Sequence, residues 1–229
     1  NALVVLTAVL PGHDLGLAVI VLTLVVKILL IPVSHKTIKT QKKMKELEPE
    51  MAKIKEAHKD NQQEQGLKIM ELYKEHGVNP FSGVFLMFIQ LPIILALFFV
   101  FKDGIDLNPL DLYSFIVKPE FINQNLFGLI DLTKKNIFLA LLVGITQFIQ
   151  VQLSIPSSPK KDKSKDGESS FSDTLAQSMN FQVKYILPIF ITFVSYSLNT
   201  AVSIYWIVNN VFTIAHELYV KNKAKAILS

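Results

Sequence analysis

The chain has 229 residues, half of them apolar, with a formal net charge of +4 and no cysteine. Several apolar runs approach the roughly 20 residues that a helix needs to cross a ~30 Å hydrocarbon layer, which argues against a soluble domain. Without cysteine there are no disulfides and no thiolate chemistry. All 23 basic residues are lysines, so any buried cation is an ammonium, which can lose its proton on desolvation as a guanidinium cannot.

The N-terminal part predicts a short helix followed by a first span. Residues 1–12 are apolar but too short to cross, and Pro11 and Gly12 end them, which favours a helix lying in the membrane interface. A frayed remnant of a longer segment fits these residues equally well. The chain starts at Asn1 without a charged leader, as expected if a signal peptide or longer N-terminal region has been removed. The first span is predicted over residues 15–33.

Residues 34–79 are rich in Lys and Glu and predict a helical hairpin in water. Their apolar residues form two stripes at helical spacing, the first containing Met44, Leu47, Met51 and Ile54 and the second containing Leu67, Met70 and Tyr73. The pattern breaks around Asp60, where a polar turn joins two antiparallel arms. Pro49 is expected to bend the first arm, because it removes a backbone donor.

The rest of the chain predicts four more spans and their connections. In order they are span two at 81–101, an outer-side loop at 102–135, span three at 136–155, a flexible cytoplasmic loop at 156–184, span four at 185–198, span five at 201–220 and a basic cytoplasmic tail at 221–229. The predicted fold is therefore an all-α membrane protein with five transmembrane helices and a cytoplasmic antiparallel hairpin between spans one and two.

The distribution of lysine sets the predicted orientation. Segments 34–79, 156–184 and 221–229 carry ten, five and three lysines, whereas 102–135 carries four lysines against five acidic residues. The positive-inside rule places the three lysine-rich segments in the cytoplasm. We expect a multi-pass protein of the bacterial plasma (inner) membrane, with its N-terminus outside and its C-terminus cytoplasmic. An organellar inner or thylakoid membrane is the alternative.

Lys27 lies within the first predicted span, where a charge costs about 2.5–3.5 kcal/mol on insertion scales. One explanation is snorkelling, since Val33 at the end of the span is about 9 Å away along the helix. The other is a wet cavity inside the bundle. We expect no Asp or Glu within the predicted spans to pair with Lys27, and an unpaired ammonium needs water, which favours a hydrated groove open to the cytoplasm.

Other polar side chains at membrane depth support such a groove. The candidates for its wall include Thr23, Gln90, Gln147, Gln150 and Asn209. Hydrogen bonding that only holds the helices together is the alternative for each of them. No metal-ligand cluster, nucleophile–base pair or glycine-rich phosphate loop is evident, so we expect neither an enzyme nor a cofactor. The five histidines are scattered, and we expect each to be a surface or interfacial residue and not a ligand.

Four stretches resemble the YidC family of membrane protein insertases, which has mitochondrial and chloroplast relatives. They are LTLVVKILLIPVSHKTIKTQKKMKELEPEMAKIKEAHKD, ELYKEHGVNPFSGVFLMFIQLPIILALF, DLYSFIVKPEFINQNLFGLIDL and VSIYWIVNNVFTIAHELYV. The resemblance implies a five-helix bundle with a cytoplasmic hairpin. It places Lys27 where family members normally carry a groove arginine, Gln147 and Gln150 on the groove wall, and Trp206 at an aromatic position of the last span.

The resemblance also implies the function. Nascent membrane proteins would enter the positively charged groove and leave into the lipid bilayer, alone or with the Sec translocon. The hairpin would contact partners. Separately, the three lysines of the basic tail favour an electrostatic contact with ribosomal RNA, with a solvated helix end as the alternative. A small anion transporter or channel that uses Lys27 as its binding site is the alternative, and a scaffold that only stabilises other membrane proteins is a third.

Overall fold

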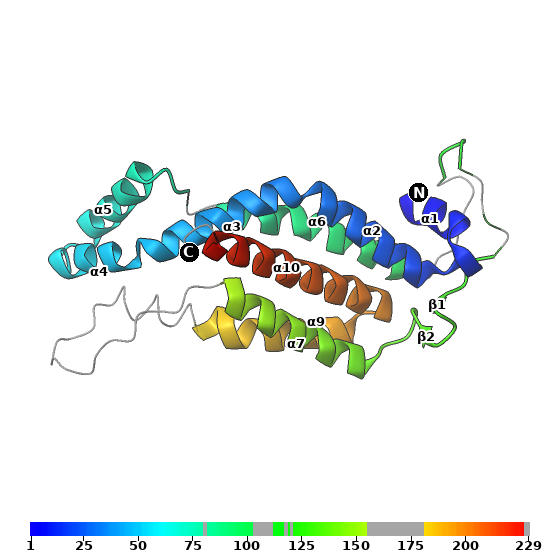
Figure 1. The fold of residues 1–229 in the computed structure, drawn as a ribbon. Helices are drawn as coiled ribbons and strands as arrows, with labels where there is room; N and C mark the ends of the chain where they lie inside the picture. Colours follow the sequence, from blue (N-terminus) through cyan, green and yellow to red (C-terminus); the bar gives the residue numbers. More distant parts are fainter. Residues whose placement is uncertain (80–81, 103–111, 117–118, 120, 155–180, 227–229) are drawn as a thin grey trace.

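The computed structural model describes residues 1–79, 82–102, 112–116, 119, 121–154 and 181–226. These residues are mostly helical, as predicted (Figure 1). The helices are α1 (Ala2–Val9), η1 (Pro11–His13), α2 (Leu15–Leu29), α3 (Ile31–Glu46), α4 (Glu48–Ala57), α5 (Gln62–Glu75), α6 (Ser82–Lys102), α7 (Ile137–Ser154), η3 (Gln182–Ile186), α9 (Leu187–Ser197) and α10 (Thr200–Ala226), and the strands are β1 (Asn125–Leu126) and β2 (Ile130–Asp131). Most of the loop predicted at 156–184, part of that at 102–135 and the end of the tail at 221–229 lie outside the described residues.

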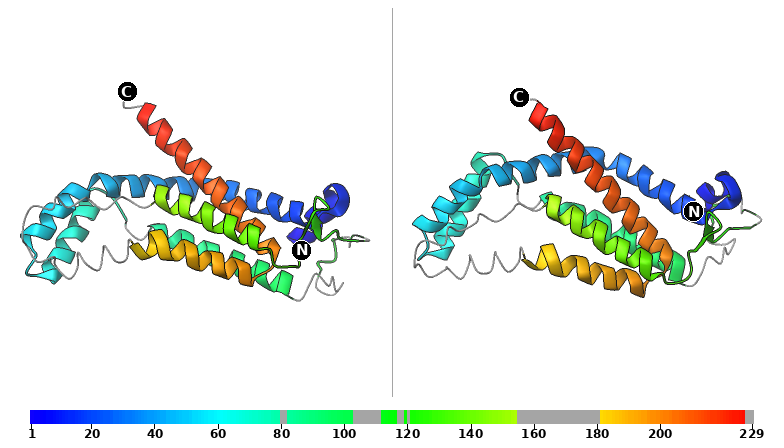
Figure 2. Two further views of the ribbon diagram at one scale, coloured as in Figure 1. Left: turned by 90° about the horizontal axis from the view of Figure 1, so that it is seen from below. Right: turned by 60° about the horizontal axis from the view of Figure 1, so that its bottom comes forward.

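The helix α10 is the central element of the bundle. It packs against α7, α2, α6 and α9. Every residue from Ala201 to Trp206 is buried, and a helix that is buried all round belongs in the middle of its neighbours. Both views in Figure 2 show that α10 crosses the other helices at an angle, so that its C-terminal end projects from the bundle. Side chains from all the surrounding helices can therefore meet on α10.

The first predicted span is broken in the structure. The carboxylate of Asp14 caps α2 by accepting from the Leu17 N–H at 2.9 Å, and α2 then ends at Leu29 rather than at Val33. The next helix, α3, starts at Ile31 and is bent from α2 by 62°. Pro32 lies in the first turn of α3, where its missing N–H breaks no helical hydrogen bond. Proline therefore starts a new helix here instead of ending the span.

The segment α4–α5 forms a helical hairpin at one end of the molecule, with Pro49 in the first turn of α4 (Figure 1). The first predicted stripe packs as expected, since Leu47 is buried with Met44, Met51 and Ile54 around it. The second stripe was wrong for Leu67 and Met70, which are 65% and 48% exposed, although its third member, Tyr73, is buried. The residues that complete the hairpin core from the second arm are Ile69, Leu72 and Tyr73.

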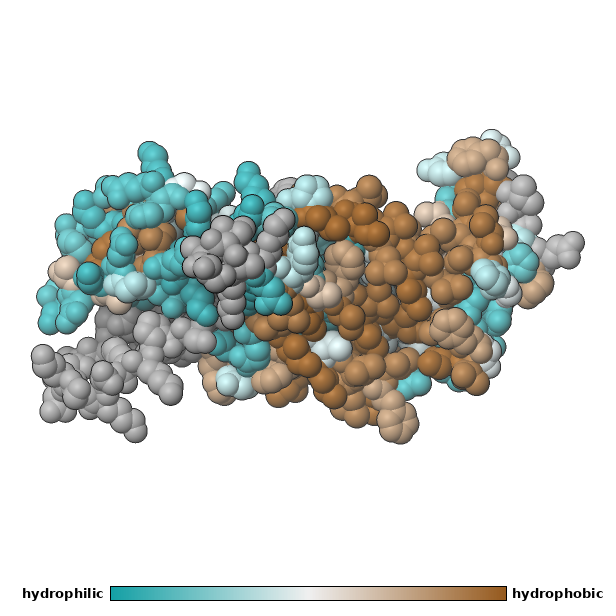
Figure 3. Space-filling view, in the orientation of Figure 1, coloured by the Kyte–Doolittle hydropathy of each residue, from teal (hydrophilic) through white to brown (hydrophobic). Residues whose placement is uncertain are grey.

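The surface divides into an apolar and a polar part. Figure 3 shows hydrophobic residues over the helical bundle and hydrophilic residues over the hairpin end. By length and composition, Ile137–Ser154 could cross a membrane, and α2 and α3 could do so together despite their bend. The helix Phe88–Phe101 is apolar but shorter. Among the described residues no other helix meets these requirements.

Candidate functional site: a polar seam along α10

Lys27 points from α2 towards α10. Its Nζ donates to the Thr213 hydroxyl at 3.1 Å, and that hydroxyl donates to the backbone carbonyl of Asn209 at 2.7 Å. The neighbouring side chains Val25 and Ile28 are exposed, whereas Lys27 is partly buried. This geometry favours a cation directed into the bundle over one that snorkels along the lipid.

The polar contacts continue from α10 to α7. The amide of Asn209 donates to Asn210 Oδ1 at 3.3 Å, and Asn210 Nδ2 donates to the Thr146 hydroxyl at 3.2 Å. Asn210 is almost fully buried, so its amide bridges the two helices away from solvent. The Oδ1 atom of Asn209 is buried and accepts no hydrogen bond from the described residues. We call Lys27, Thr213, Asn209, Asn210 and Thr146 the polar seam, because they join α2, α10 and α7.

A second set of polar groups runs along α7. Gln147 Nε2 donates to Gln150 Oε1 at 3.0 Å, and Gln150 Nε2 lies 3.5 Å from the Ser154 hydroxyl. That hydroxyl donates to Glu217 on α10 at 2.7 Å. The two predicted glutamines therefore interact with each other. Through Ser154 these contacts extend from α7 to Glu217 on α10.

The expectation of a bundle without carboxylates was wrong. Glu217 lies inside the predicted fifth span and is only 2% exposed. Its partner is Lys221, whose Nζ lies 2.8 Å from Glu217 Oε1 and also donates to the Leu153 carbonyl at 2.6 Å. Lys27 forms no ion pair with any described carboxylate. The buried carboxylate is thus matched by its own helix, and Lys27 remains without an acidic partner in the described part of the chain.

The contacts of the other three predicted site residues do not involve Lys27. The amide of Gln90 donates to the Tyr205 hydroxyl, which joins α6 to α10. The Thr23 hydroxyl donates to the Val19 carbonyl at 2.6 Å within its own helix. Trp206 packs in an apolar cluster with Val143 and Val202. Trp206 and Thr23 therefore support the packing of the bundle, whereas Lys27, Asn209, Gln147 and Gln150 belong to polar chains.

Sequence reasoning missed two members of these contacts. Thr213 is the partner of Lys27 and Tyr205 is the partner of Gln90, and each joins helices distant in sequence. Two of the histidines expected to be scattered also meet: the rings of His35 on α3 and His216 on α10 stack with centroids 5.9 Å apart. The i,i+4 spacing of Glu217 and Lys221 was the one signal in the sequence that could have identified a partner.

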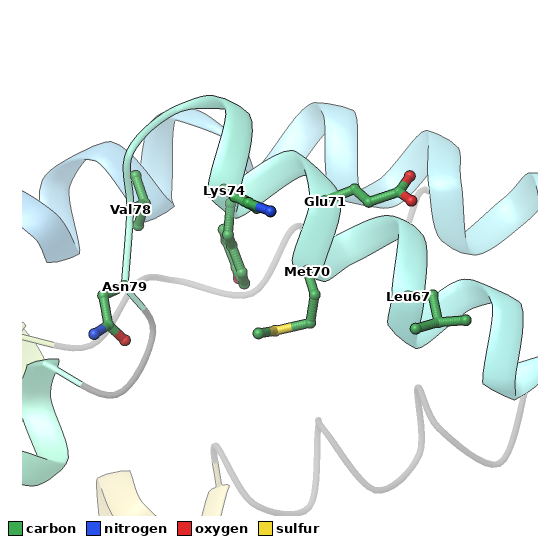
Figure 4. A pocket seen from close by; sticks show the side chains of 7 residues that line it. Leu67, Met70, Glu71, Lys74, Val78 and Asn79 are labelled. Atoms are coloured by element: carbon green, nitrogen blue, oxygen red, sulfur yellow. The ribbon is translucent and has the colours of Figure 1, made fainter.

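An open hollow of about 390 Å³ lies on the hairpin, away from the polar seam (Figure 4). It is lined by Leu67, Met70, Glu71, Tyr73, Lys74, Val78 and Asn79. The exposed Leu67 and Met70 side chains contribute much of its apolar lining, which explains where the misassigned stripe points. Its lining comes from α5 and the residues that follow, so it shares no residue with the seam.

The chemistry of the polar seam follows from its five side chains. Its groups are an ammonium, hydroxyls and amides, which attract and hydrogen-bond polar groups. Among the described residues, no three His, Asp or Glu side chains come together as metal ligands. The seam therefore offers positive charge and hydrogen bonds at a depth where the surrounding surface is apolar.

The chain is similar to known membrane proteins over most of its length. The family model described as 60Kd inner membrane protein matches residues 6–226. Proteins named membrane protein insertase YidC are similar to it: 30% identical over 213 residues in Citrifermentans bemidjiense (92% of this chain and 34% of that protein), 31% over 206 residues in Pelobacter propionicus (90% and 34%) and 32% over 205 residues in Francisella tularensis subsp. novicida (88% and 31%). The chain thus spans about a third of the length of these curated relatives.

Proposed function

This chain belongs to the 60Kd inner membrane protein family, and from that premise we propose that it is a membrane protein insertase. It receives nascent membrane proteins in a hydrophilic, positively charged groove and releases their spans into the lipid bilayer. The relatives that carry the insertase name favour this function over a small anion transporter. The work requires no covalent chemistry and no cofactor.

The contact between Lys27 and Thr213 is the observation that carries the proposal. An ammonium turned towards the bundle, with a hydroxyl rather than a carboxylate as its partner, keeps a net positive charge. A neutral partner leaves that charge available to an acidic segment of an incoming chain. Asn209 Oδ1, next along the seam, is buried and accepts no hydrogen bond from the described residues, so it would serve as an acceptor for a backbone N–H of the same segment once the helices separate there.

The mechanism combines attraction with hydrophobic burial. The polar seam and the α7 glutamines line a groove that shortens the hydrocarbon path a polar segment must cross. The hydrophobic helix of the client then moves into lipid, which stabilises it by about 25 cal/mol per Å² of apolar surface removed from water. Lys27 thus attracts the polar segment of the client, which resists insertion. The lipid stabilises the hydrophobic helix of the client, which favours insertion.

We assign α2, α6, α7, η3 with α9, and α10 as the five spans of the proposed arrangement. The hairpin then lies in the cytoplasm with the lysine-rich segments, and the N-terminus lies outside a bacterial inner membrane. The hairpin and the basic end of α10 are the surfaces that would meet the ribosome, and the Sec translocon is the proposed partner within the membrane.

Replacement of Lys27 tests the electrostatic role. We expect Lys27→Ala to reduce insertion of a single-span client with an acidic tail at least fourfold, because the seam loses its only cation. Lys27→Arg should retain at least half of the activity, since it keeps the charge. The measurement is protease protection of the client's tail in proteoliposomes that contain the purified protein.

The matched controls are a client with a neutral tail and the variant Ile28→Ala on the lipid-facing side of the same helix. Lys27→Ala should change insertion of the neutral-tail client by no more than about a factor of two. Ile28→Ala should change insertion of the acidic-tail client by no more than about the same factor. If Lys27→Ala inserts the acidic and neutral clients as well as the unmodified chain does, the lysine has no role in recruitment.

A further inference from the structure

The loop between β1 and β2 exposes two large apolar side chains at its tip. Phe127 is 67% exposed and Leu129 is 86% exposed, with Gly128 between them. We call Phe127, Gly128 and Leu129 the ribbon tip. It lies at the end of the molecule where α2 begins, opposite the hairpin (Figure 1). A loop in water normally carries polar residues at such a position, so this exposure requires an explanation.

The ribbon tip also has an unfavourable backbone for its sequence. Phe127 has φ 51° and Gly128 has φ 72°, so two successive residues adopt the left-handed region. Turns of this kind favour Asn, Asp and Gly, because a bulky side chain at positive φ is sterically costly. Phenylalanine at this position is therefore unfavourable both for its conformation and for its contact with water.

The loop is fastened to the ends of the bundle helices. Asp14, which caps α2, accepts from the Phe127 N–H at 2.7 Å through its second oxygen. Leu126 packs so closely on α2 that a Cβ at Gly16 would come within 2.7 Å of it. Further along, the Thr200 N–H at the start of α10 donates to the Lys134 carbonyl at 2.9 Å. These contacts fix the position of the ribbon tip relative to the first residues of α2 and α10.

The flank of the loop is polar where the tip is apolar. Asp131 pairs with Lys134 at 2.9 Å and accepts from the Thr133 hydroxyl at 2.6 Å. Three hydrogen bonds lower the pKa of the Asp131 carboxyl to about 2: in decreasing order of effect, they come from the Thr133 hydroxyl, from Lys134 and from the Thr133 backbone N–H. The carboxyl group therefore stays ionised at neutral pH. One side of the loop therefore belongs in water.

The helix that follows the loop in sequence also begins with exposed apolar side chains. Ile137 and Phe138, in the first turn of α7, and Leu141, one turn on, are all exposed. Two side chains are far too few for a stable protein interface, which needs about 800 Å² from each partner. Phe and Leu are, by contrast, typical of interfacial segments that bury an apolar face at the boundary between lipid head groups and acyl chains.

We propose that the ribbon tip inserts into the interfacial layer of the lipid leaflet at this end of the bundle. Phe127 and Leu129 contact acyl chains there, while Asp131 and Lys134 remain in water. Because Asp14 holds the tip to α2, the lipid contact fixes the depth of the helix that carries Lys27. This goes beyond insertase activity and requires only that the chain spans a membrane with this end at its surface.

Single cysteines in this cysteine-free chain test the proposal. Phe127→Cys, with Thr133→Cys as the matched control on the polar flank, is labelled with the dye NBD. Each protein is placed at low density in phosphatidylethanolamine–phosphatidylglycerol vesicles. At position 127 we expect quenching by doxyl lipids and a Stern–Volmer constant for aqueous iodide at least fivefold below that at position 133. Equal iodide constants at the two positions would overturn the insertion, as would protection at 127 from both quenchers, which would indicate a protein contact.

A second variant needs no dye. Phe127→Asn replaces phenylalanine by a residue that suits positive φ better, so a purely structural role predicts slower or unchanged amide exchange across residues 121–133. The lipid contact predicts the opposite, with exchange in vesicles at least threefold faster than in the unmodified chain. Unchanged or slower exchange in vesicles would contradict the proposal.

Discussion

The charged side chains of Glu217 and Lys27, both within the helical bundle, are stabilised in different ways. Glu217 is matched within its own helix by Lys221 and by the Ser154 hydroxyl from α7. Lys27 has a hydroxyl partner and no carboxylate among the described residues. A buried pair that neutralises itself holds helices together, whereas a cation with a neutral partner is available to a ligand. The ion pair therefore contributes to stability, whereas Lys27 carries the binding role that we propose.

Lys221→Ala should destabilise the protein more than Glu217→Ala does. Removal of one partner of a buried pair costs about 3–5 kcal/mol, and the exposure of Lys221 reduces the cost here to about 2 kcal/mol. The asymmetry arises because Glu217 is buried and would stay without its ion-pair partner, whereas the half-exposed lysine can turn to water. Denaturation of the two variants in mixed micelles measures the difference. An equal loss in both would show that the carboxylate is already solvated.

The residue types of the site were predictable from the sequence, but most of its contacts were not. An ammonium and several amides within apolar runs are visible in any hydropathy reading. The pairing of Lys27 with Thr213 joins residues 186 positions apart and depends on how α2 crosses α10. Trp206, placed at an aromatic position of the last span by resemblance, packs in an apolar cluster. Residue type follows from local sequence, while the partner follows from the crossing of helices.

The helices themselves show where periodicity succeeds and where it fails. Apolar length placed α7 within one residue at each end, because Asn136 caps it and the apolar run ends at Ser154. Periodicity failed on α5, where Leu67 and Met70 have helical spacing but face outward. This helix has apolar residues on two faces. Which of the two faces is buried depends on how α4 packs against it.

A matched pair of leucines on α5 tests which face is the core of the hairpin. Leu72→Ala should destabilise the hairpin by about 2–4 kcal/mol, because a buried side chain is removed from the cluster around Leu47. Leu67→Ala should change it by less than about 0.5 kcal/mol, since that side chain is exposed. Hydrogen exchange of residues 48–75 in the full chain gives both values. A larger effect at Leu67 would reinstate the stripe predicted from the sequence.

At the scale of the whole molecule, the two ends differ in chemistry. The hairpin end is hydrophilic, and residues 34–79 carry ten of the 23 lysines, whereas the opposite end holds the β ribbon and its apolar tip (Figures 1 and 3). The apolar bundle lies between them, with the polar seam inside it. An attractive site for acidic segments is useful only if it opens towards the side on which clients are made. The orientation of the bundle therefore decides whether the seam can serve insertion.

Single cysteines at the two ends test that orientation. Lys59→Cys lies in the turn between α4 and α5, and Thr133→Cys lies beside the β ribbon. In right-side-out vesicles a membrane-impermeant maleimide should label position 133 and leave position 59 unlabelled, because lysine-rich segments stay in the cytoplasm. Inside-out vesicles should give the converse, and detergent should expose both. If both cysteines react from one side, the bundle does not separate its two ends across the membrane, and if the sides are reversed, the hairpin cannot meet a nascent chain.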